Sequence, residues 1–339
     1  MKVLVTGGCG YIGSHTIVDL IQAGYEVICI DNNSRSNCNI HANIEVLTGN
    51  HVPHYTADLR ELKSLETVFD ENKNVGAILH FAAFKCVGES VENPLLYYEN
   101  NVIGLLNLLK CVNKYNIPYF VFSSSCTVYG QPDKMPVTEL TPMKPPTSPY
   151  GATKQMCEHI LRDFFQRKSR PKNQKVCILR YFNPAGAHPS LLIGENPNVG
   201  VPSLTTAIVS AVKNQQSIHV FGSDYNTKDG TCVRDFIHVC DIAHAHTLAI
   251  HYLMNSKDKP VSTYNLGAGK PHTVLEAIGI FSKVNALPMP IQMKERRQGD
   301  AEAIYANCEL AKKELGWVPV YTIEDIMKTA YLYDQKYTT

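Results

Sequence analysis

The sequence predicts an α/β protein with a doubly wound parallel sheet of the Rossmann type and a second, smaller α/β lobe. Short apolar runs alternate with longer helical patterns through the first half of the 339-residue chain. A glycine-rich stretch follows the first apolar run directly. After about Pro184 the alternation gives way to loop-like segments and short, separated apolar runs.

Apolar runs bounded by turn residues are expected to form buried parallel strands. They are Val3–Thr6, Val27–Ile30, Val52–Thr56, Ala77–Phe81, Tyr119–Phe122 and Val176–Arg180. Stretches with helical periodicity lie between these runs, at Ile12–Ala23, Leu62–Phe69, Pro94–Tyr115 and Tyr150–Arg167. Strands that alternate with helices in this way predict a sheet covered by helices on both faces.

Composition excludes some partners. Lys and Arg number 32 against 31 Asp and Glu, so the chain has no overall positive field for nucleic acid or an anionic membrane.

The chain begins with Met1-Lys2-Val3, which leads into a strand without an export signal, so we expect a cytoplasmic protein. Its 11 cysteines show no metal-type spacing, and we expect reduced thiols and no metal site.

The glycine-rich stretch predicts a dinucleotide site. Gly7, Gly10 and Gly13 lie between a strand and a helix, where glycines permit a tight turn and a close approach of the backbone to a pyrophosphate. Asp31 ends the second strand about 20 residues further on, where a carboxylate can accept both hydroxyls of an adenosine ribose. This acid favours NAD, and Arg35 nearby leaves NADP open.

The chain is expected to consist of two parts with different binding functions. We expect residues 1–183 to form an NAD-binding domain and residues 184–339 to form mainly a substrate-binding lobe. Elements within about 235–267 are expected to return to the first domain.

A tyrosine and a lysine four residues apart predict acid-base chemistry. Tyr150 and Lys154 begin a helix and share one face of it, and Ser125 ends an expected strand. Only about one free tyrosine in a thousand is ionised at pH 7, so a tyrosine base needs its pKa lowered by about three units, or roughly 4 kcal/mol. We expect Lys154 to contribute to this.

Together these motifs resemble the extended short-chain dehydrogenase/reductase family, and most closely its UDP-glucose 4-epimerase group. The resemblance covers nearly the whole chain. It extends through Phe81-Ala82-Ala83-Phe84-Lys85, Val87-Gly88-Glu89-Ser90, Leu179-Arg180-Tyr181-Phe182-Asn183-Pro184, Val233-Arg234-Asp235-Phe236-Ile237-His238-Val239 and Tyr264-Asn265-Leu266-Gly267.

The resemblance implies an isomerase that inverts carbon 4 of a UDP-linked hexose by transient oxidation with tightly bound NAD. Tyr150 would take the proton of the 4-hydroxyl and later return it, and Ser125 would hydrogen-bond the reacting oxygen. UDP-galactose and UDP-glucose would interconvert without net redox change, as galactose metabolism requires. The family also suggests a homodimer formed through the helices around Pro94–Tyr115 and Tyr150–Arg167.

The matched positions also imply two sets of contacts. Those expected at NAD are Gly7, Gly10, Tyr11, Ile12, Gly13, Asp31, Asn32, Asp58, Leu59, Phe81, Ala82, Ala83, Lys85, Asn100, Ser125, Tyr150, Lys154 and Phe182. Those expected at the UDP-sugar are Lys85, Ser125, Tyr150, Tyr181, Asn183, Phe221, Arg234, Arg297 and Asp300. Arg234 and Arg297 suit the diphosphate because guanidinium groups bind anionic oxygens bidentately.

The chain departs from the family pattern at three positions, and a fourth leaves the range of substrates open. Ser203 stands where an asparagine is expected, so one polar substrate contact is open. Cys126 replaces an alanine and Cys232 a glycine, with no functional account for either thiol. Ile304 matches a residue that sets room for an N-acetyl group, and its intermediate size leaves UDP-N-acetyl hexosamines open as substrates.

Other interpretations predict different residues or products. A nucleotide-sugar 4,6-dehydratase would carry an Asp-Glu pair after the strand-end serine, where this chain has Cys126-Thr127-Val128. A reductase would consume reduced cofactor, and a non-catalytic NAD-binding protein would not need Tyr150 and Lys154. Arg234 could instead pair locally with Asp235. The histidines of the 238–251 segment lack a persuasive set of additional metal ligands.

Overall fold

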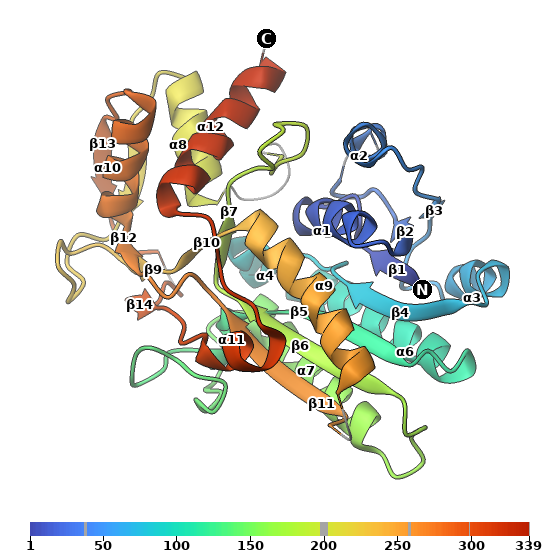
Figure 1. Ribbon diagram of the computed structural model, residues 1–339. Coiled ribbons are helices and arrows are strands. Elements are labelled where there is room, and N and C mark those ends of the chain that lie inside the picture. The colour runs from blue at the N-terminus through green and yellow to red at the C-terminus, as the bar shows by residue number, and fades with distance from the viewer. Residues whose placement is uncertain (37–38, 197–202, 257–258, 298, 339) are drawn as a thin grey trace.

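The computed structural model describes residues 1–339 except 37–38, 197–202, 257–258, 298 and 339. A seven-stranded parallel sheet crosses the molecule with the strand order β11-β6-β5-β4-β1-β2-β3 (Figure 1). Its strands are β1 (Lys2–Thr6), β2 (Glu26–Asp31), β3 (His54–Thr56), β4 (Val75–His80), β5 (Tyr119–Ser125), β6 (Lys175–Tyr181) and β11 (Val261–Leu266). The expected fold class, a doubly wound Rossmann-type sheet, is confirmed.

Helices cover both faces of this sheet. One face carries α1 (Tyr11–Gln22), α2 (Ile40–Thr48), α9 (Val239–Asn255) and α11 (Glu309–Leu315), and the other carries α3 (Leu62–Glu71), α6 (Gly104–Lys114) and α7 (Pro149–Gln166). Alternate residues of each strand face opposite cores: Val3 and Val5 pack toward α1 and α9, whereas Leu4 packs toward α3 and α6. This double burial explains why the strands are nearly continuous apolar runs.

The expected helix at Pro94–Tyr115 is interrupted. It consists of α5 (Pro94–Tyr98), the π-helical segment η1 (Glu99–Ile103) and α6, and a short helix α4 (Val87–Glu92) precedes it. Within η1, the buried Asn101 side chain accepts a hydrogen bond from the Phe84 amide and donates to the Phe84 carbonyl and the Thr153 hydroxyl. Apolar periodicity does not reveal such a π-bulge, and π-bulges are frequent near functional sites.

Two other local expectations differ from the structure. The strand expected from Val52 begins at His54, because Pro53 has no amide hydrogen for the ladder. Helix α2 was not predicted from the sequence, and it lies over the edge of the sheet near β2 and β3 (Figure 1).

Most of the chain after β6 forms a separate lobe at the upper left of Figure 1. Three short sheets join β10-β7, β12-β9-β14 and β13-β8. The elements are β7 (Asn183–Ala185), α8 (Leu204–Lys213), β8 (Ile218–Phe221), β9 (Val233–Arg234), β10 (Phe236–His238), β12 (His272–Thr273), α10 (Val274–Asn285), β13 (Ile291–Lys294), β14 (Ala303–Ile304) and α12 (Ile323–Thr338). A core of its own packs α8, α10 and α12 together.

Three elements of the later chain, β11, α9 and α11, belong spatially to the first part. β11 pairs with β6 in the large sheet, and α9 packs beside α1 on one face of it. The assignment of residues 1–183 and 184–339 to separate binding functions stays a prediction. No helix within the described ranges has the length and apolar character needed to cross a membrane.

Candidate active site

The carboxyl ends of the seven parallel strands of the large sheet lie at the edge where the candidate catalytic residues are found. The order of the strands reverses between β1 and β4, and ligands of α/β sheets bind outside the carboxyl ends at such a point. Ser125 is the last residue of β5, and Tyr150 and Lys154 lie in the first turns of α7. Tyr150 and Ser125 are each 9% exposed and Lys154 is 4% exposed. These side chains are therefore buried and do not form a solvated pair on the surface of a helix.

The start of α7 orients Tyr150 and Lys154. Ser148 is the N-cap, its hydroxyl accepts the Gly151 amide hydrogen at 3.2 Å, and Pro149 occupies the first turn. Lys154 Nζ donates to the Ser123 carbonyl oxygen at 2.7 Å and lies 5.9 Å from the centre of the Tyr150 ring. The ammonium is therefore near the phenol ring but is held by the backbone of β5.

The electrostatics of Tyr150 differ from the sequence expectation. Burial raises the pKa of Tyr150 to about 12, although a hydrogen bond with Ser125 opposes the rise. Burial lowers the pKa of Lys154 to about 8, so the ammonium still prevails at pH 7. Ionising Tyr150 at pH 7 then requires about 7 kcal/mol of stabilisation, rather than roughly 4, because desolvation outweighs the neighbouring polar groups.

A buried ion pair braces α7 against the sheet one turn after Lys154. Glu158 is 0% exposed and accepts hydrogen bonds from Arg180 Nε at 2.9 Å and Arg180 Nη2 at 2.7 Å. The Ser124 hydroxyl donates to the same carboxylate at 2.6 Å. Burial alone would raise the pKa of Glu158, but Arg180 holds it below its usual value. This pairing of Glu158 with Arg180 and Ser124 was not predicted from the sequence.

The glycine loop packs too tightly for side chains. Gly7 has φ of +70°, and a Cβ there would lie 2.6 Å from the Ala82 nitrogen, while a Cβ on Gly13 would lie 2.3 Å from the Gly7 carbonyl oxygen. Gly10 is the N-cap of α1 and supplies no capping side chain. Amides at this helix start are therefore available to an anion such as a pyrophosphate. Tyr11 donates its hydroxyl to the Gly186 carbonyl at 2.6 Å and joins the two lobes.

Acidic and amide groups gather at the carboxyl ends of β2 and β3. Asp31 is buried and accepts hydrogen bonds from the amides of Cys9 at 3.0 Å and Asn33 at 2.9 Å. Asn32 donates to Asp58 at 3.0 Å. The structure thus brings the three residues expected at the adenosine close together.

Two basic groups near this region have acidic partners. Arg35 forms two hydrogen bonds with Glu89, at 2.5 and 2.6 Å, so its guanidinium is engaged away from Asp31. Arg60 binds Asp58 and holds the pKa of that carboxyl at about 2. Engagement of Arg35 leaves the negative Asp31 to select a free ribose, which favours NAD over NADP.

The segment after β4 lines the same edge. The Ala82 backbone lies against Gly7, and Phe81, Ala82 and Ala83 follow β4 directly. Lys85 pairs with Glu195 at 2.7 Å, and the Ser203 hydroxyl donates to the same carboxylate at 2.6 Å.

Three further residues expected at NAD make packing or hydrogen-bond contacts within the fold. Asn100 lies in η1 and donates to Asn101 at 3.0 Å, while Leu59 packs against Gly104 at the start of α6. Ile12 packs against the core on the α1 and α9 face. Ser203, which departs from the family pattern, also caps α8 by accepting the Thr206 amide at 3.3 Å.

Charged residues of the second lobe that are expected at the UDP-sugar lie close together. Arg234 Nη2 lies 3.6 Å from Asp300 Oδ1, and Arg297 Nε donates to Asp300 Oδ2 at 3.1 Å. The Arg297 guanidinium carbon lies 4.6 Å from the centre of the Phe221 ring. Arg234 does not pair with Asp235, whose carboxylate instead accepts backbone amides of Ala268, Gly269 and Ala306. The local ion-pair alternative for Arg234 is therefore wrong.

The region between the lobes holds the remaining predicted sugar contacts. The Tyr181 hydroxyl lies 3.0 Å from His246 Nε2. Burial raises the pKa of Tyr181 well above its usual value, with a smaller contribution from Tyr150. Phe182, Cys126 and Ile304 pack in one buried cluster. The Asn183 Oδ1 atom is buried without a hydrogen-bond partner, which leaves an acceptor for a bound molecule.

Thr127 is a residue that the sequence argument missed. It lies in the short 3-10 helix η2 (Cys126–Tyr129), two residues after Ser125, and its Oγ1 is buried without a hydrogen-bond partner. An orphaned hydroxyl at this place suits a polar ligand. Its only signal in the sequence was its position within the run that follows the strand-end serine.

The histidines of the 238–251 segment have other partners. His246 binds the Ile242 carbonyl and Tyr181, and His244 lies 3.4 Å from Asp19. They do not form a metal-ligand group within the described part of the chain.

Comparison with known proteins agrees with this geometry. A model of the GDP-mannose 4,6-dehydratase family matches residues 4–330. UDP-glucose 4-epimerase of Bacillus subtilis is 44% identical over 96% of this chain and 94% of its own length. UDP-glucose 4-epimerase 2 of Arabidopsis thaliana is 45% identical over 96% of this chain and 93% of its own.

Solved structures give the same result. The UDP-glucose 4-epimerase of Bifidobacterium longum, in complex with NAD+ and UDP, superposes with a TM-score of 0.93 at 42% identity, over 99% of this chain and 98% of that one. The UDP-Glc/GlcNAc 4-epimerase of Campylobacter jejuni has a TM-score of 0.84 at 33% identity, over 99% of both chains. The chain belongs to the family that the matching model describes and, within it, to the UDP-glucose 4-epimerase group.

Proposed function

We propose that this protein is an NAD-dependent isomerase that interconverts UDP-galactose and UDP-glucose. The observation that carries the proposal is the burial of Tyr150, Lys154 and Ser125 together at the edge of the sheet beside the glycine loop. The similarity to epimerases over nearly the full length supports the same reaction.

The residues of the first domain fit NAD. Gly7 and Gly13 form a cradle that a Cβ would fill, and the start of α1 offers amides without a capping side chain. Asp31 would accept the hydroxyls of the adenosine ribose, and Asp58 lies beside it through Asn32. When bound, the nicotinamide ring supplies a reversible hydride acceptor and a positive charge.

Tyr150 would hold and return the proton of the sugar 4-hydroxyl. Its hydroxyl is hydrogen-bonded to Ser125, which can also contact the reacting oxygen. Lys154, fixed to the Ser123 carbonyl, supplies a positive charge near the phenol that favours the phenolate. Closure of this region to water increases the effect of each charge.

The second lobe would hold the UDP. Arg234 and Arg297 can bind diphosphate oxygens, and both now share Asp300, which a ligand would partly replace. Phe221 offers an aromatic face beside Arg297 for the uracil. Asn183 and Thr127 contribute unpartnered oxygens on the sugar side.

A second activity on UDP-N-acetyl hexosamines has its own support. Ile304 is buried against Phe182 and Cys126 in one cluster, and it is smaller than the aromatic side chains that would close the space for an N-acetyl group. The Campylobacter jejuni relative is a UDP-Glc/GlcNAc 4-epimerase.

We further propose a cytoplasmic homodimer. Apolar side chains of adjacent helices α5, η1, α6 and α7 are exposed, with Leu95 73% and Leu106 41% exposed. Such a patch is typical of a buried interface. The described cysteines are free, which agrees with a reducing compartment.

One incubation series tests the reaction. The purified protein is given UDP-galactose, UDP-glucose and the two UDP-N-acetyl hexosamines separately, and products are separated by chromatography and read by NMR. We expect 4-epimers to form without net consumption of NAD. A 4-keto-6-deoxy product would indicate a dehydratase, and net NADH consumption a reductase. Failure to interconvert any of these sugars would overturn the proposal.

A further inference from the structure

Four potential metal ligands meet at the side of the sheet that carries the glycine loop. Cys9 lies within that loop, Cys29 in β2, His41 in the first turn of α2 and His54 at the start of β3. They come from four separate elements, spaced by 20, 12 and 13 positions in the sequence. This spacing explains why the sequence argument found no metal-type pattern.

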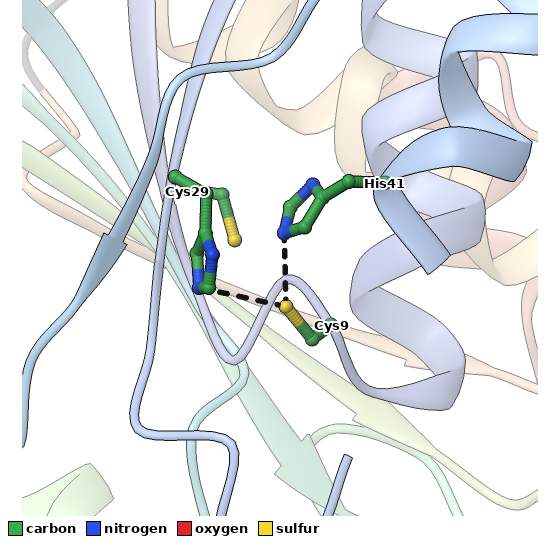
Figure 2. Close-up of side chains that lie close together, drawn as sticks. Cys9, Cys29 and His41 are labelled. Atoms are coloured by element: carbon green, nitrogen blue, oxygen red, sulfur yellow. Dashed lines mark hydrogen bonds between the residues drawn. The ribbon is translucent and has the colours of Figure 1, made fainter. Parts of the chain in front are cut away.

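Strand register accounts for part of the convergence. Cys29 is paired directly with His54 across the β2–β3 ladder, and Val5 of β1 is paired with Cys29 on the other side. Residues paired in neighbouring parallel strands project from the same face of the sheet. The loop after β1 then brings Cys9 over that face, and α2 adds His41 from above. Figure 2 shows Cys9, Cys29 and His41 directed toward one another.

The separations suit one tetrahedral ion. Cys9 Sγ lies 3.1 Å from His41 Nε2 and 3.7 Å from His54 Nε2, and the four ligand atoms lie within 4.8 Å of one another. A zinc ion with S and N bonds of about 2.3 and 2.05 Å would place ligand atoms about 3.3–3.8 Å apart. Small side-chain adjustments would bring these four atoms to that geometry.

We infer that Cys9, Cys29, His41 and His54 form a structural zinc site at the glycine loop. Two sulfur and two imidazole ligands in a tetrahedral arrangement favour zinc over magnesium or calcium, which prefer oxygen. Four protein ligands leave no open position for a substrate, so the site is structural rather than catalytic. This inference does not depend on the proposed epimerase activity.

The surroundings favour a bound cation. Cys9 and Cys29 are buried, and two thiolates beside Asp31 would repel it and each other without a compensating charge. Zinc binding would release the two thiol protons to solvent and balance both thiolates. The His54 ring is hydrogen-bonded to the Asp31 backbone, and its Nε2 faces Cys9 Sγ at 3.7 Å, as expected of an imidazole oriented for a metal ion.

The zinc would tie the NAD-binding loop to the neighbouring elements β2, α2 and β3. Cys9 is flanked by Gly8 and Gly10, and its amide donates to the Asp31 carboxylate at 3.0 Å. Coordination would therefore fix the loop to β2, α2 and β3 next to the expected ribose site. Loss of the metal should loosen this loop and weaken NAD retention.

Metal content of the holoenzyme tests the inference. The protein is purified without a metal-binding tag under a reductant, equilibrated with micromolar zinc, passed over a desalting column and analysed by elemental mass spectrometry. We expect about one zinc per chain. Cobalt replacing zinc should give an intense thiolate-to-cobalt charge-transfer absorption and tetrahedral ligand-field bands.

Matched variants separate coordination from folding. His54→Asn and His41→Asn each remove one ligand, and His51→Asn is the control, because His51 is 76% exposed in the loop just before His54. We expect both ligand variants to bind zinc more than about 100-fold more weakly, whereas the control binds it as the wild type does. Circular dichroism and urea unfolding check that each variant has folded.

Three outcomes would overturn the site. The wild type could retain less than about a tenth of an equivalent of zinc. Both ligand variants could hold zinc as tightly as the control. Peptide mapping of unreduced protein could find Cys9 and Cys29 joined in a disulfide, which would make the cluster a redox pair instead. An inactive epimerase that still bound one zinc would affect only the proposed function.

Discussion

The replacement of Tyr150 by Phe tests the chemistry most directly. The change removes one oxygen and leaves the buried ring in place, so the packing of α7 should be preserved. Loss of the hydrogen bond to Ser125 should alter the free energy of unfolding by only about 1 kcal/mol. Turnover should fall by about 10²–10⁴, because general base catalysis contributes that factor.

The pKa of Tyr150 adds a second signature. With a pKa of about 12, only about one molecule in 10⁵ carries the phenolate at pH 7 unless bound groups stabilise it, which corresponds to about 7 kcal/mol. The phenolate fraction increases as pH rises toward the pKa. The wild-type kcat should therefore rise with pH through the pKa that the assembled site gives Tyr150, before loss of the Lys154 ammonium lowers it above about pH 8. The Phe variant should lack this rise.

The assay measures the initial conversion of UDP-galactose to UDP-glucose with a coupled UDP-glucose dehydrogenase. The pH is varied over roughly 5.5–9.5, a range in which histidine and tyrosine side chains change their protonation. Tyr115→Phe is the control, because its hydroxyl binds Glu66 and Asp70 at the surface. Retained NAD and urea unfolding are measured for both variants. A Tyr150→Phe enzyme that keeps more than about a tenth of the wild-type kcat would refute the assignment of Tyr150 as the base.

Glu158→Gln should lower the free energy of unfolding by about 3–5 kcal/mol, because it leaves the buried Arg180 charge unpaired; a loss below about 1 kcal/mol in urea titrations would contradict this. Burial lowers the pKa of Lys154 to about 8, so kcat should fall as pH rises through 8 and the ammonium is lost. In Lys154→Arg this fall in kcat should move to higher pH. If the fall stays at the same pH, it belongs to another group. Ile304→Tyr should cut kcat/KM for UDP-N-acetylglucosamine more than 10-fold and spare UDP-glucose, and equal effects on both sugars would place Ile304 outside the N-acetyl pocket. Leu106→Glu should convert the dimer to monomer in sedimentation, and an unchanged sedimentation coefficient would exclude this face.

Local patterns allowed much of the fold to be predicted. Strands buried on both faces must be apolar throughout, so β1, β2, β4, β5 and β6 could be identified as apolar runs. The π-helical segment η1 could not, because it depends on Asn101 binding the backbone of Phe84 from a distant loop. Helix α2 was missed as well, since only one of its residues, Ile44, is buried.

The same distinction applies to the site. The spacing of Gly7, Gly10 and Gly13 and the pair Tyr150 and Lys154 are short-range features, so the chain alone indicated their chemistry. Their energetics were not visible there: the high pKa of Tyr150 follows from burial, and the Lys154 hydrogen bond goes to β5.

By itself, the sequence determined which elements form and which reactive groups stand at their ends, because helix and strand periods, turns and i,i+4 pairs act over a few residues. Tertiary structure alone decided which distant groups meet. Arg234 of β9 meets Asp300 of a later loop, and Cys9, Cys29, His41 and His54 meet through the register of β2 and β3 together with the positions of the glycine loop and α2. Such long-range contacts depend on packing between elements, and no local spacing encodes them.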